Sequence, residues 1–185
     1  MKPKIAYIIW FSQRVGSSLL CRVLESTGIA GRPEEILNPS HTLDLMKHYK
    51  TRSYIDLQKL LWKKGMTSNG VLGIKDSYYK SHIEMMIKIF KKFPDTKNCI
   101  TKPEIWENAF PNCKYIYMTR RNKVRLAVSS YRAIKTGVWC KKGKIKKKNY
   151  LSIKYSYQDI NNLVVMNTMK EAGIQDFLMK AILLL

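Results

Sequence analysis

The chain has 185 residues, of which 45% are hydrophobic, and this size and apolar content support one domain with a buried core over residues 1–185. Its formal net charge of +21 favours anionic partners, without choosing among nucleic acid, a membrane surface and small phosphorylated ligands. No run reaches the roughly 18–20 apolar residues of a membrane span, and we expect no signal peptide. The four cysteines show no C-x-x-C pair and no spacing suited to zinc, so we expect no metal and a cytoplasmic protein with reduced thiols.

The N-terminal segment predicts a strand, a tight turn and a helix. Residues 4–10 form a short run of apolar, β-branched and aromatic side chains, which is typical of a buried strand. After the turn, apolar residues recur at helical spacing until Gly28 ends the helix. The residues of this stripe are Leu19, Leu20, Val23 and Leu24.

The turn between this strand and this helix combines one arginine, one glycine and two hydroxyls. Backbone N–H groups and the positive end of the helix dipole point at one spot there, which suits a phosphate or sulfate. Gly16 lets the backbone come close to the anion, and Arg14 adds a fixed charge with a forked donor face. Ser17 and Ser18 add hydroxyl donors, although the segment taken alone fits a plain turn and helix cap equally well. No lysine follows Gly16, so a Walker A motif is excluded.

The middle of the chain alternates helices and loops around one further strand. Ser53 and Ser81 are expected to cap helices, and Thr101 with Glu104 forms a capping box. A proline-rich loop carries two adjacent carboxylates in a chain that has few. The predicted segments are a loop over 30–39, a short helix over 40–49, a helix over 54–64, a buried strand over 71–75, a helix from about 81 and another over 101–110.

A third strand over 114–118 runs into the charged turn Arg120-Arg121, and a helix over 123–135 follows. Strands that alternate with helices form a parallel sheet with right-handed crossovers. Ligands of such sheets bind at the carboxyl ends of the strands. Arg14 and Arg120-Arg121 lie at two such ends, and Lys75 closes the second strand as a third candidate wall.

The C-terminal part contains a basic run and a helical segment. Residues of about 140–150 include six lysines in a short stretch, which we interpret as a solvated loop, with nucleic-acid or membrane-surface contact as the alternative. A helical segment is predicted over 157–185, and its last residues are strongly apolar.

Four blocks of the sequence, in order, resemble the bacterial trehalose 2-sulfotransferase family. Residues 12–20 are similar to its S-Q-R-S-G-S-T-L-L loop, and residues 27–35 to its T-G-V-A-G-x-P-x-E segment. Residues 70–75 are similar to its G-V-x-G-x-K strand, and residues 121–139 to its R-x-x-x-x-x-A-V-S-x-W-R-A-x-x-T-x-V-W segment. The resemblance implies an α/β fold, a P-loop-like parallel sheet with helices on both faces, that lacks the C-terminal part of the family.

The resemblance also implies an activity and a donor. It implies a sulfotransferase that moves a sulfuryl group in line from 3′-phosphoadenosine-5′-phosphosulfate (PAPS) to a hydroxyl of a carbohydrate or glycolipid, without a metal. The implied 3′-phosphate ligands are Arg121 and Ser129. The implied general base is Glu35, with His41 or His48 as the next candidates. The implied ligands of the 5′-phosphosulfate are Arg14, Gly16, Ser17 and Ser18.

Departures from the family pattern leave alternatives open. Val15 replaces a serine of the loop, Arg32 replaces a glutamate, and residues 76–78 replace an apolar stretch, so the acceptor need not be trehalose. A truncated, non-catalytic nucleotide-binding remnant is the second hypothesis. A basic nucleic-acid-binding protein is a third and weaker one, because the charge is its only support. Homodimerisation stays open.

Overall fold

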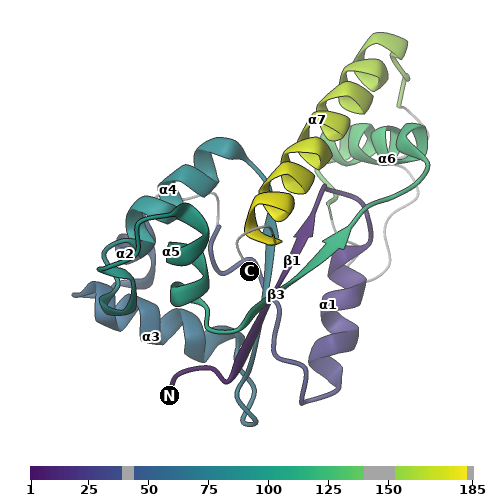
Figure 1. Ribbon diagram of the computed structural model, residues 1–185. Helices are drawn as coiled ribbons and strands as arrows, with labels where there is room; N and C mark the ends of the chain where they lie inside the picture. Colours follow the sequence, from purple (N-terminus) through teal and green to yellow (C-terminus); the bar gives the residue numbers. More distant parts are fainter. Residues whose placement is uncertain (39–43, 140–152, 183–185) are drawn as a thin grey trace.

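The core of the protein is a three-stranded parallel sheet. We describe residues 1–38, 44–139 and 153–182 of a computed structural model. Strands β1 (Ile5–Phe11), β2 (Val71–Ser77) and β3 (Cys113–Met118) lie in the order β2-β1-β3. Phe11 is paired with Ser77 on one side and Met118 on the other, so all three strands end at the same edge. The predicted α/β class with a parallel sheet is confirmed (Figure 1).

Helices cover both faces of the sheet. Figure 1 shows α1 on one side and the group α2–α5 on the other, while α6 and the first half of α7 extend past the tips of the strands. The described helices are α1 (Ser17–Ser26), α2 (Leu45–Tyr49), α3 (Tyr54–Gly65), α4 (Lys80–Phe90), α5 (Lys102–Ala109), α6 (Lys123–Thr136) and α7 (Tyr157–Ile182), with the 3-10 helix η2 at Pro94–Thr96.

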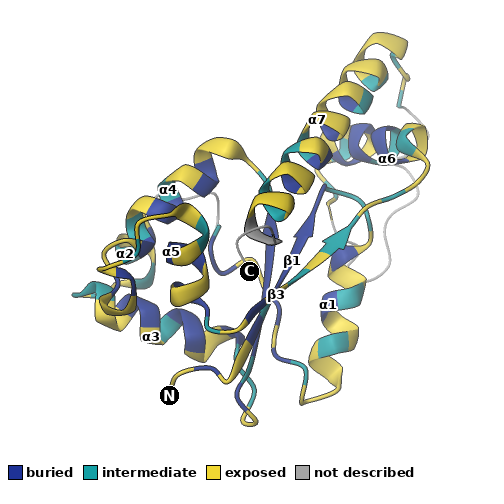
Figure 2. Ribbon diagram, in the orientation of Figure 1, coloured by how far each residue is buried: buried dark blue, intermediate teal, exposed yellow. Residues whose placement is uncertain are grey.

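An aromatic cluster forms the centre of the core. Figure 2 shows that β1 and β2 are buried along most of their length. Trp10 of β1 and Trp106 of α5 are fully buried, with ring centroids 5.6 Å apart. Phe90 of α4 meets Trp106 edge-on at 5.0 Å, and Phe177 of α7 meets Trp10 at 5.3 Å. Burial of several large rings supplies the main free energy of folding. The cluster therefore joins α4, α5 and α7 to the central strand.

The apolar stripe of α1 is not the buried face of that helix. Leu19 is 70% exposed and Val23 is 54% exposed, whereas Ser17 and Cys21 are buried. Ser17 and Cys21 are four residues apart and small, so they form one face that can lie close to the sheet. Helical periodicity identifies the helix correctly, but it does not identify the face that packs.

Most predicted helix starts are confirmed, and one is wrong. Ser53 Oγ accepts from the backbone N–H of Asp56 at 3.1 Å, and the capping box of Thr101 and Glu104 is formed. Ser81 does not cap α4, because that helix already begins at Lys80 and Ser81 lies in its first turn. The basic run at 140–150 lies outside the described residues.

Gly31 fixes the loop that carries the two adjacent carboxylates. Its φ is +75°, and a Cβ on it would lie 2.5 Å from the backbone nitrogen of Gly73 in β2. The N–H of Gly31 donates to Thr67 Oγ1 at 3.1 Å. The loop is therefore held against the sheet at a point where any side chain would displace backbone.

We expect Gly31→Ala to lower the free energy of unfolding by about 2–4 kcal/mol, because backbone strain and a backbone clash add. Urea denaturation measures this change. Gly28→Ala is the matched control, since Gly28 has a similar φ of +71° but open space around it. The control should cost only about 1 kcal/mol. Equal losses in the two variants would contradict the role of the close approach to β2.

Candidate functional site

A cleft of about 480 Å³ opens at the carboxyl ends of the strands. It is the position at which parallel α/β sheets bind ligands. The strand ends, the turn before α1, the carboxylate-bearing loop and α6 all contribute to it. Its lining residues are Phe11, Gln13, Arg14, Gly16, Ser17, Ser18, Glu35, Lys75, Arg120, Ser129 and Trp139.

The turn between β1 and α1 presents backbone donors to this cleft. Gly16 is the N-cap of α1 with φ +94°, and no side-chain hydrogen bond among the described residues caps this end of the helix. The N–H groups of Ser17 and Ser18 lie in the first turn, where a helix supplies no backbone acceptor. Leu19 N–H, one residue further, does reach the carbonyl of Gly16 at 3.0 Å. The predicted turn between strand and helix is formed, and the backbone N–H groups of Ser17 and Ser18 point into it without an acceptor from the helix itself.

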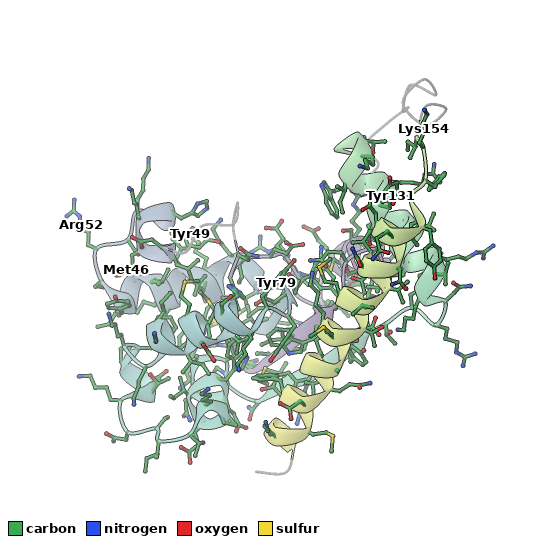
Figure 3. The ribbon with its side chains drawn as sticks, turned by 90° about the horizontal axis from the view of Figure 1, so that it is seen from above. Met46, Tyr49, Arg52, Tyr79, Tyr131 and Lys154 are labelled. Atoms are coloured by element: carbon green, nitrogen blue, oxygen red, sulfur yellow. The ribbon has the colours of Figure 1, made fainter. Side chains whose placement is uncertain are left out.

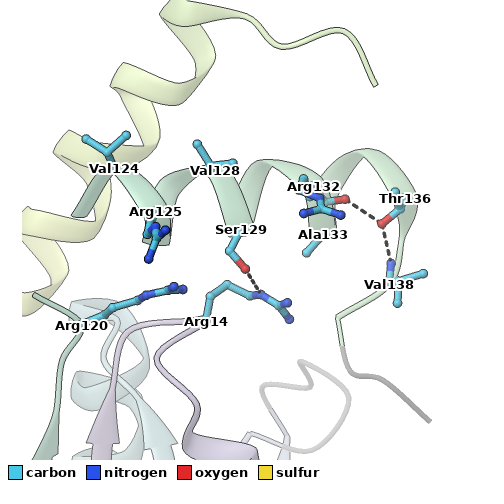
Figure 4. A pocket seen from close by; sticks show the side chains of 10 residues that line it. All are labelled: Arg14, Arg120, Val124, Arg125, Val128, Ser129, Arg132, Ala133, Thr136 and Val138. Carbon is cyan, nitrogen blue, oxygen red and sulfur yellow. Dashed lines mark hydrogen bonds between the residues drawn. The ribbon is translucent and has the colours of Figure 1, made fainter. Parts of the chain in front are cut away.

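Arg14 connects this turn to α6. Its φ of +71° is unusual for a residue with a side chain, so the backbone orients the arginine at a cost in strain. Arg14 Nε donates to Ser129 Oγ at 3.0 Å (Figure 4). Its guanidinium also donates to the carbonyl of Trp139. Arg14 and Ser129, which the family resemblance implies as PAPS-binding residues, are 115 positions apart and in direct contact.

A second cleft of about 530 Å³ runs along α6 and shares Arg14, Arg120 and Ser129 with the first. Arg125 and Arg132 of α6 also line it. Figure 4 shows the side chains of Arg14, Arg120 and Arg125 reaching into the same space beside the helix. Its remaining lining residues are small or aliphatic, apart from one hydroxyl: Val124, Val128, Ala133, Thr136 and Val138.

Arg121, the predicted partner of Ser129, lines neither cleft and is exposed. The neighbouring Arg120 lines both. The two residues follow the end of β3, where the chain turns toward α6, and only the first of them faces Ser129 across the cleft.

Glu35 lies in the first cleft as an ion pair. Its Oε1 is 2.7 Å from Lys75 Nζ, and the same ammonium is 3.3 Å from Ser18 Oγ and 4.7 Å from the centre of the Phe11 ring. The Lys75 side chain is only 11% exposed, whereas that of Glu35 is 41% exposed. One buried cation thus connects the predicted base to the predicted anion-binding turn. His48 is an exposed residue of α2 that does not line the cleft, and His41 lies outside the described residues.

Comparison with known proteins matches this chain over residues 6–183 to the model of one family, the Stf0 sulphotransferases. The chain belongs to the Stf0 sulphotransferase family. It is also 27% identical, over 158 residues, to a trehalose 2-sulfotransferase of Mycolicibacterium smegmatis (strain ATCC 700084 / mc(2)155). That match covers 72% of this chain and 58% of the relative, so the chain spans less than two thirds of the length of this curated relative.

A buried polar contact that was not predicted from the sequence attaches α7 to the end of β1 and the start of α6 in this Stf0 sulphotransferase. Buried Glu171 of α7 accepts from Ser12 Oγ at 2.9 Å and pairs with Lys123 at the start of α6. Lys123 also donates to Thr119 Oγ1 at 2.7 Å. One carboxylate thus joins the end of β1, the start of α6 and α7. Glu171 is one of three acidic residues in α7, and nothing in the sequence distinguishes it from Asp159 or Asp176.

The described residues of this sulphotransferase contain no group of three or more His, Cys, Asp and Glu side chains arranged to hold a metal ion. None of the helices in the described part of the chain is long and apolar enough to cross a membrane. Burial raises the pKa of Cys21 in α1 to about 11, so this thiol remains protonated at neutral pH and is a poor nucleophile. The reactive groups at the cleft are therefore Glu35, Lys75 and the arginines.

Proposed function

We propose that the protein transfers a sulfuryl group from PAPS to a hydroxyl of a carbohydrate or glycolipid. The observation that carries this proposal is the contact of Arg14 with Ser129, which joins two cationic clefts into one continuous site. PAPS carries anionic groups at both its 5′ and 3′ positions. A site with a phosphate-binding turn at one end and an arginine-lined hollow at the other matches that separation of charge.

In this proposal the turn before α1 binds the 5′-phosphosulfate through Arg14, Gly16, Ser17 and Ser18. Those residues combine backbone donors, hydroxyls and a guanidinium at one end of the first cleft. Charge-assisted hydrogen bonds of this kind are about twice as strong as neutral ones. The donor would therefore be oriented with its sulfuryl group toward Glu35 and Lys75, which share the same cleft.

We propose Arg120, with Ser129, as the ligand of the 3′-phosphate in place of the predicted Arg121. Both Arg120 and Ser129 line the two clefts, and Arg125 extends the positive wall. Arginine suits this role because its planar fork binds phosphate through two parallel hydrogen bonds.

The pair of adjacent arginines provides a direct test. We expect Arg120→Ala to weaken binding of the desulfated product, 3′-phosphoadenosine-5′-phosphate (PAP), by about 10–150-fold, the loss that about 1.5–3 kcal/mol of charge-assisted hydrogen bonding gives. Arg121→Ala removes the same charge from the exposed neighbour and should change affinity less than about threefold, because exposed pairs contribute little. Isothermal titration measures both. The reverse order of effects would return the assignment to Arg121.

In the transfer step, the acceptor oxygen forms a bond to sulfur while the bond from sulfur to the donor phosphate oxygen breaks. Glu35 would take the acceptor proton, because an alcohol is a poor nucleophile until its proton is removed. Its Oε1 is held by Lys75, so Oε2 is the oxygen left for the acceptor. The negative charge that develops on the leaving phosphate would be stabilised by Arg14, and Lys75 would stabilise the moving sulfuryl group. PAP is then the leaving group, and the negative charge on its 5′-phosphate is balanced by Arg14 until it dissociates.

Two measurements test the proposal as a whole. With PAP at about 100 times its dissociation constant, ligand linkage gives about 2.7 kcal/mol of stabilisation, or about 5–10 °C in Tm for a chain of this size. Incubation with sulfur-labelled PAPS and a panel of sugars and glycolipids should label a product. The absence of any PAP-induced shift would overturn the proposal at the level of the donor.

A further inference from the structure

A groove of about 720 Å³ lies between the start of α4 and the middle of α7, and the proposed chemistry does not use it. Its α7 wall is apolar and open, with Val165 50% exposed, Met166 43% and Met169 70%. Tyr79 forms the opposite side and lies beside α7 in Figure 3. Pockets of this size hold small molecules, and methionine side chains adapt to irregular apolar ligands.

A hydrogen-bonded group connects this groove to the donor cleft. Gln13, which lines the donor cleft, donates through its side-chain amide to Tyr79 Oη. Lys170 Nζ donates to Gln13 Oε1 at 3.0 Å and to Tyr79 Oη at 3.2 Å, and it lies 4.3 Å from the centre of the Tyr79 ring. Tyr79 and Lys170 line the groove. The groove and the cleft are therefore neighbours that meet at Gln13.

The wall of the groove at the end of β2 is fixed by buried contacts. Asp76 is fully buried, accepts from the backbone N–H of Ser77 at 2.9 Å, and lies 3.0 Å from His82 Nε2 in the first turns of α4. Burial raises the pKa of Asp76, and the contact with His82 opposes that rise. On the α7 side, a Cβ at Gly173 would lie 2.4 Å from the Tyr78 ring, so glycine permits this close contact. The groove is thus preformed.

We propose that this groove binds the apolar aglycone of an amphiphilic glycoside, whose sugar reaches over Gln13 to Glu35. The inference rests on the proposed function, because it names the acceptor of that site. Lys170 and Gln13 make the end next to the cleft polar, and Val165, Met166 and Met169 form an apolar wall along α7. The other polar residues of the lining are Lys80, Ser81 and Glu84 on α4 and Asn162 at the far end. From Lys170 to Asn162 the groove follows α7 for about 12 Å, at 1.5 Å per residue. A free sugar would leave these apolar side chains uncovered.

A short series of alkyl glucosides tests this inference without any turnover. Methyl, butyl, hexyl and octyl β-D-glucoside are titrated below their micelle concentrations into the protein saturated with PAP. We expect the affinity to rise about two- to fourfold with each added methylene, as half or full burial of a CH₂ gives. An affinity that does not depend on chain length would overturn the proposal.

The variant Met166→Gln/Met169→Gln should flatten this dependence to less than about 1.5-fold per methylene, because it replaces the apolar wall. Met179→Gln is the matched control, since Met179 is 63% exposed on the same helix but does not line the groove. It should keep the full slope. An unchanged slope in the double variant would place the alkyl chain elsewhere and overturn the assignment. So would size-exclusion data showing a wild-type dimer that the double variant dissociates, because the groove would then be a subunit contact.

The readouts separate this inference from the function on which it rests. A protein that shows no Tm shift with PAP contradicts the proposed donor. A protein that shows the PAP shift and transfers labelled sulfate equally well to methyl and octyl glucosides retains the proposed function and loses the aglycone groove.

Discussion

Arg14→Ala is expected to remove most of the stabilisation by PAP and to reduce sulfate transfer to background. Arg14 lines both clefts and lies at the turn that presents backbone donors. Truncation of a hydrogen-bonded charge pair costs about 2–5 kcal/mol, which corresponds to a loss of affinity of about 30-fold or more. At the PAP concentration that shifts the wild-type Tm by about 5–10 °C, the variant should show at most about a third of that shift. Differential scanning fluorimetry and the labelled-sulfate assay measure the two effects.

Two further variants separate charge from geometry. Arg14→Lys keeps the positive charge but loses the Nε–H that donates to Ser129, so we expect intermediate PAP binding. Arg52→Ala removes an exposed arginine at the far end of the molecule (Figure 3) and should leave the shift unchanged. If Arg14→Ala kept the wild-type shift, the two clefts would not be one nucleotide site.

The sheet and the anion-binding turn could be predicted because their signals are local. Alternation of apolar strands with amphipathic helices specifies a parallel sheet, and the glycine and hydroxyls of the turn are adjacent in sequence. The packing of α1 could not be predicted in this way. Leu19 and Val23, half of its apolar stripe, are exposed, whereas Leu20 and Leu24 are half-buried. The residues that are buried are the small Ser17 and Cys21. The reason is that small residues permit close approach, and hydropathy does not record that property.

The composition of the site depends on which way each charged side chain points, and the adjacent residues in the sequence do not determine that direction. Lys75 is on the same face of the sheet as Phe11 and enters the cleft, whereas Asp76 is next to Trp10 in register and enters the core. From sequence, the two charged residues at the end of this strand are equivalent. The same ambiguity applies to Arg120 and Arg121. Only the pairing of the strands and the direction of the chain beyond them decide which side chain faces the ligand.

Contacts between distant parts of the chain are the other feature of the site that could not be predicted from the sequence. Glu171 and Ser12 are 159 positions apart, and Glu35 and Lys75 belong to a loop and a strand that are separated by two helices. No sequence motif predicts these two contacts. They nevertheless attach α7 to the end of β1 and pair the proposed base with its cation.

Glu35→Gln is expected to lower turnover by about 10²–10⁴-fold, the contribution of a positioned general base, while PAP binding is kept. Glutamine has nearly the same shape, and its amide oxygen can still accept from Lys75, so the cleft keeps its geometry. Loss of the negative charge also frees the Lys75 ammonium to pair with the anionic donor. We therefore expect PAP affinity to stay equal or to increase. Single-turnover transfer and isothermal titration measure the two parameters separately.

Lys75→Met distinguishes a base from a residue that only holds the lysine. If Glu35 acted solely by positioning Lys75, both variants would lose turnover and donor affinity together. If Glu35 is the base, Lys75→Met weakens PAP binding, because a buried ammonium 3.3 Å from Ser18 is lost, whereas Glu35→Gln leaves binding intact and stops the chemistry. Full turnover in Glu35→Gln would contradict the assignment, since no other carboxylate lines the described part of the cleft. The opposite responses of these two contacting side chains are therefore the decisive observation for the mechanism.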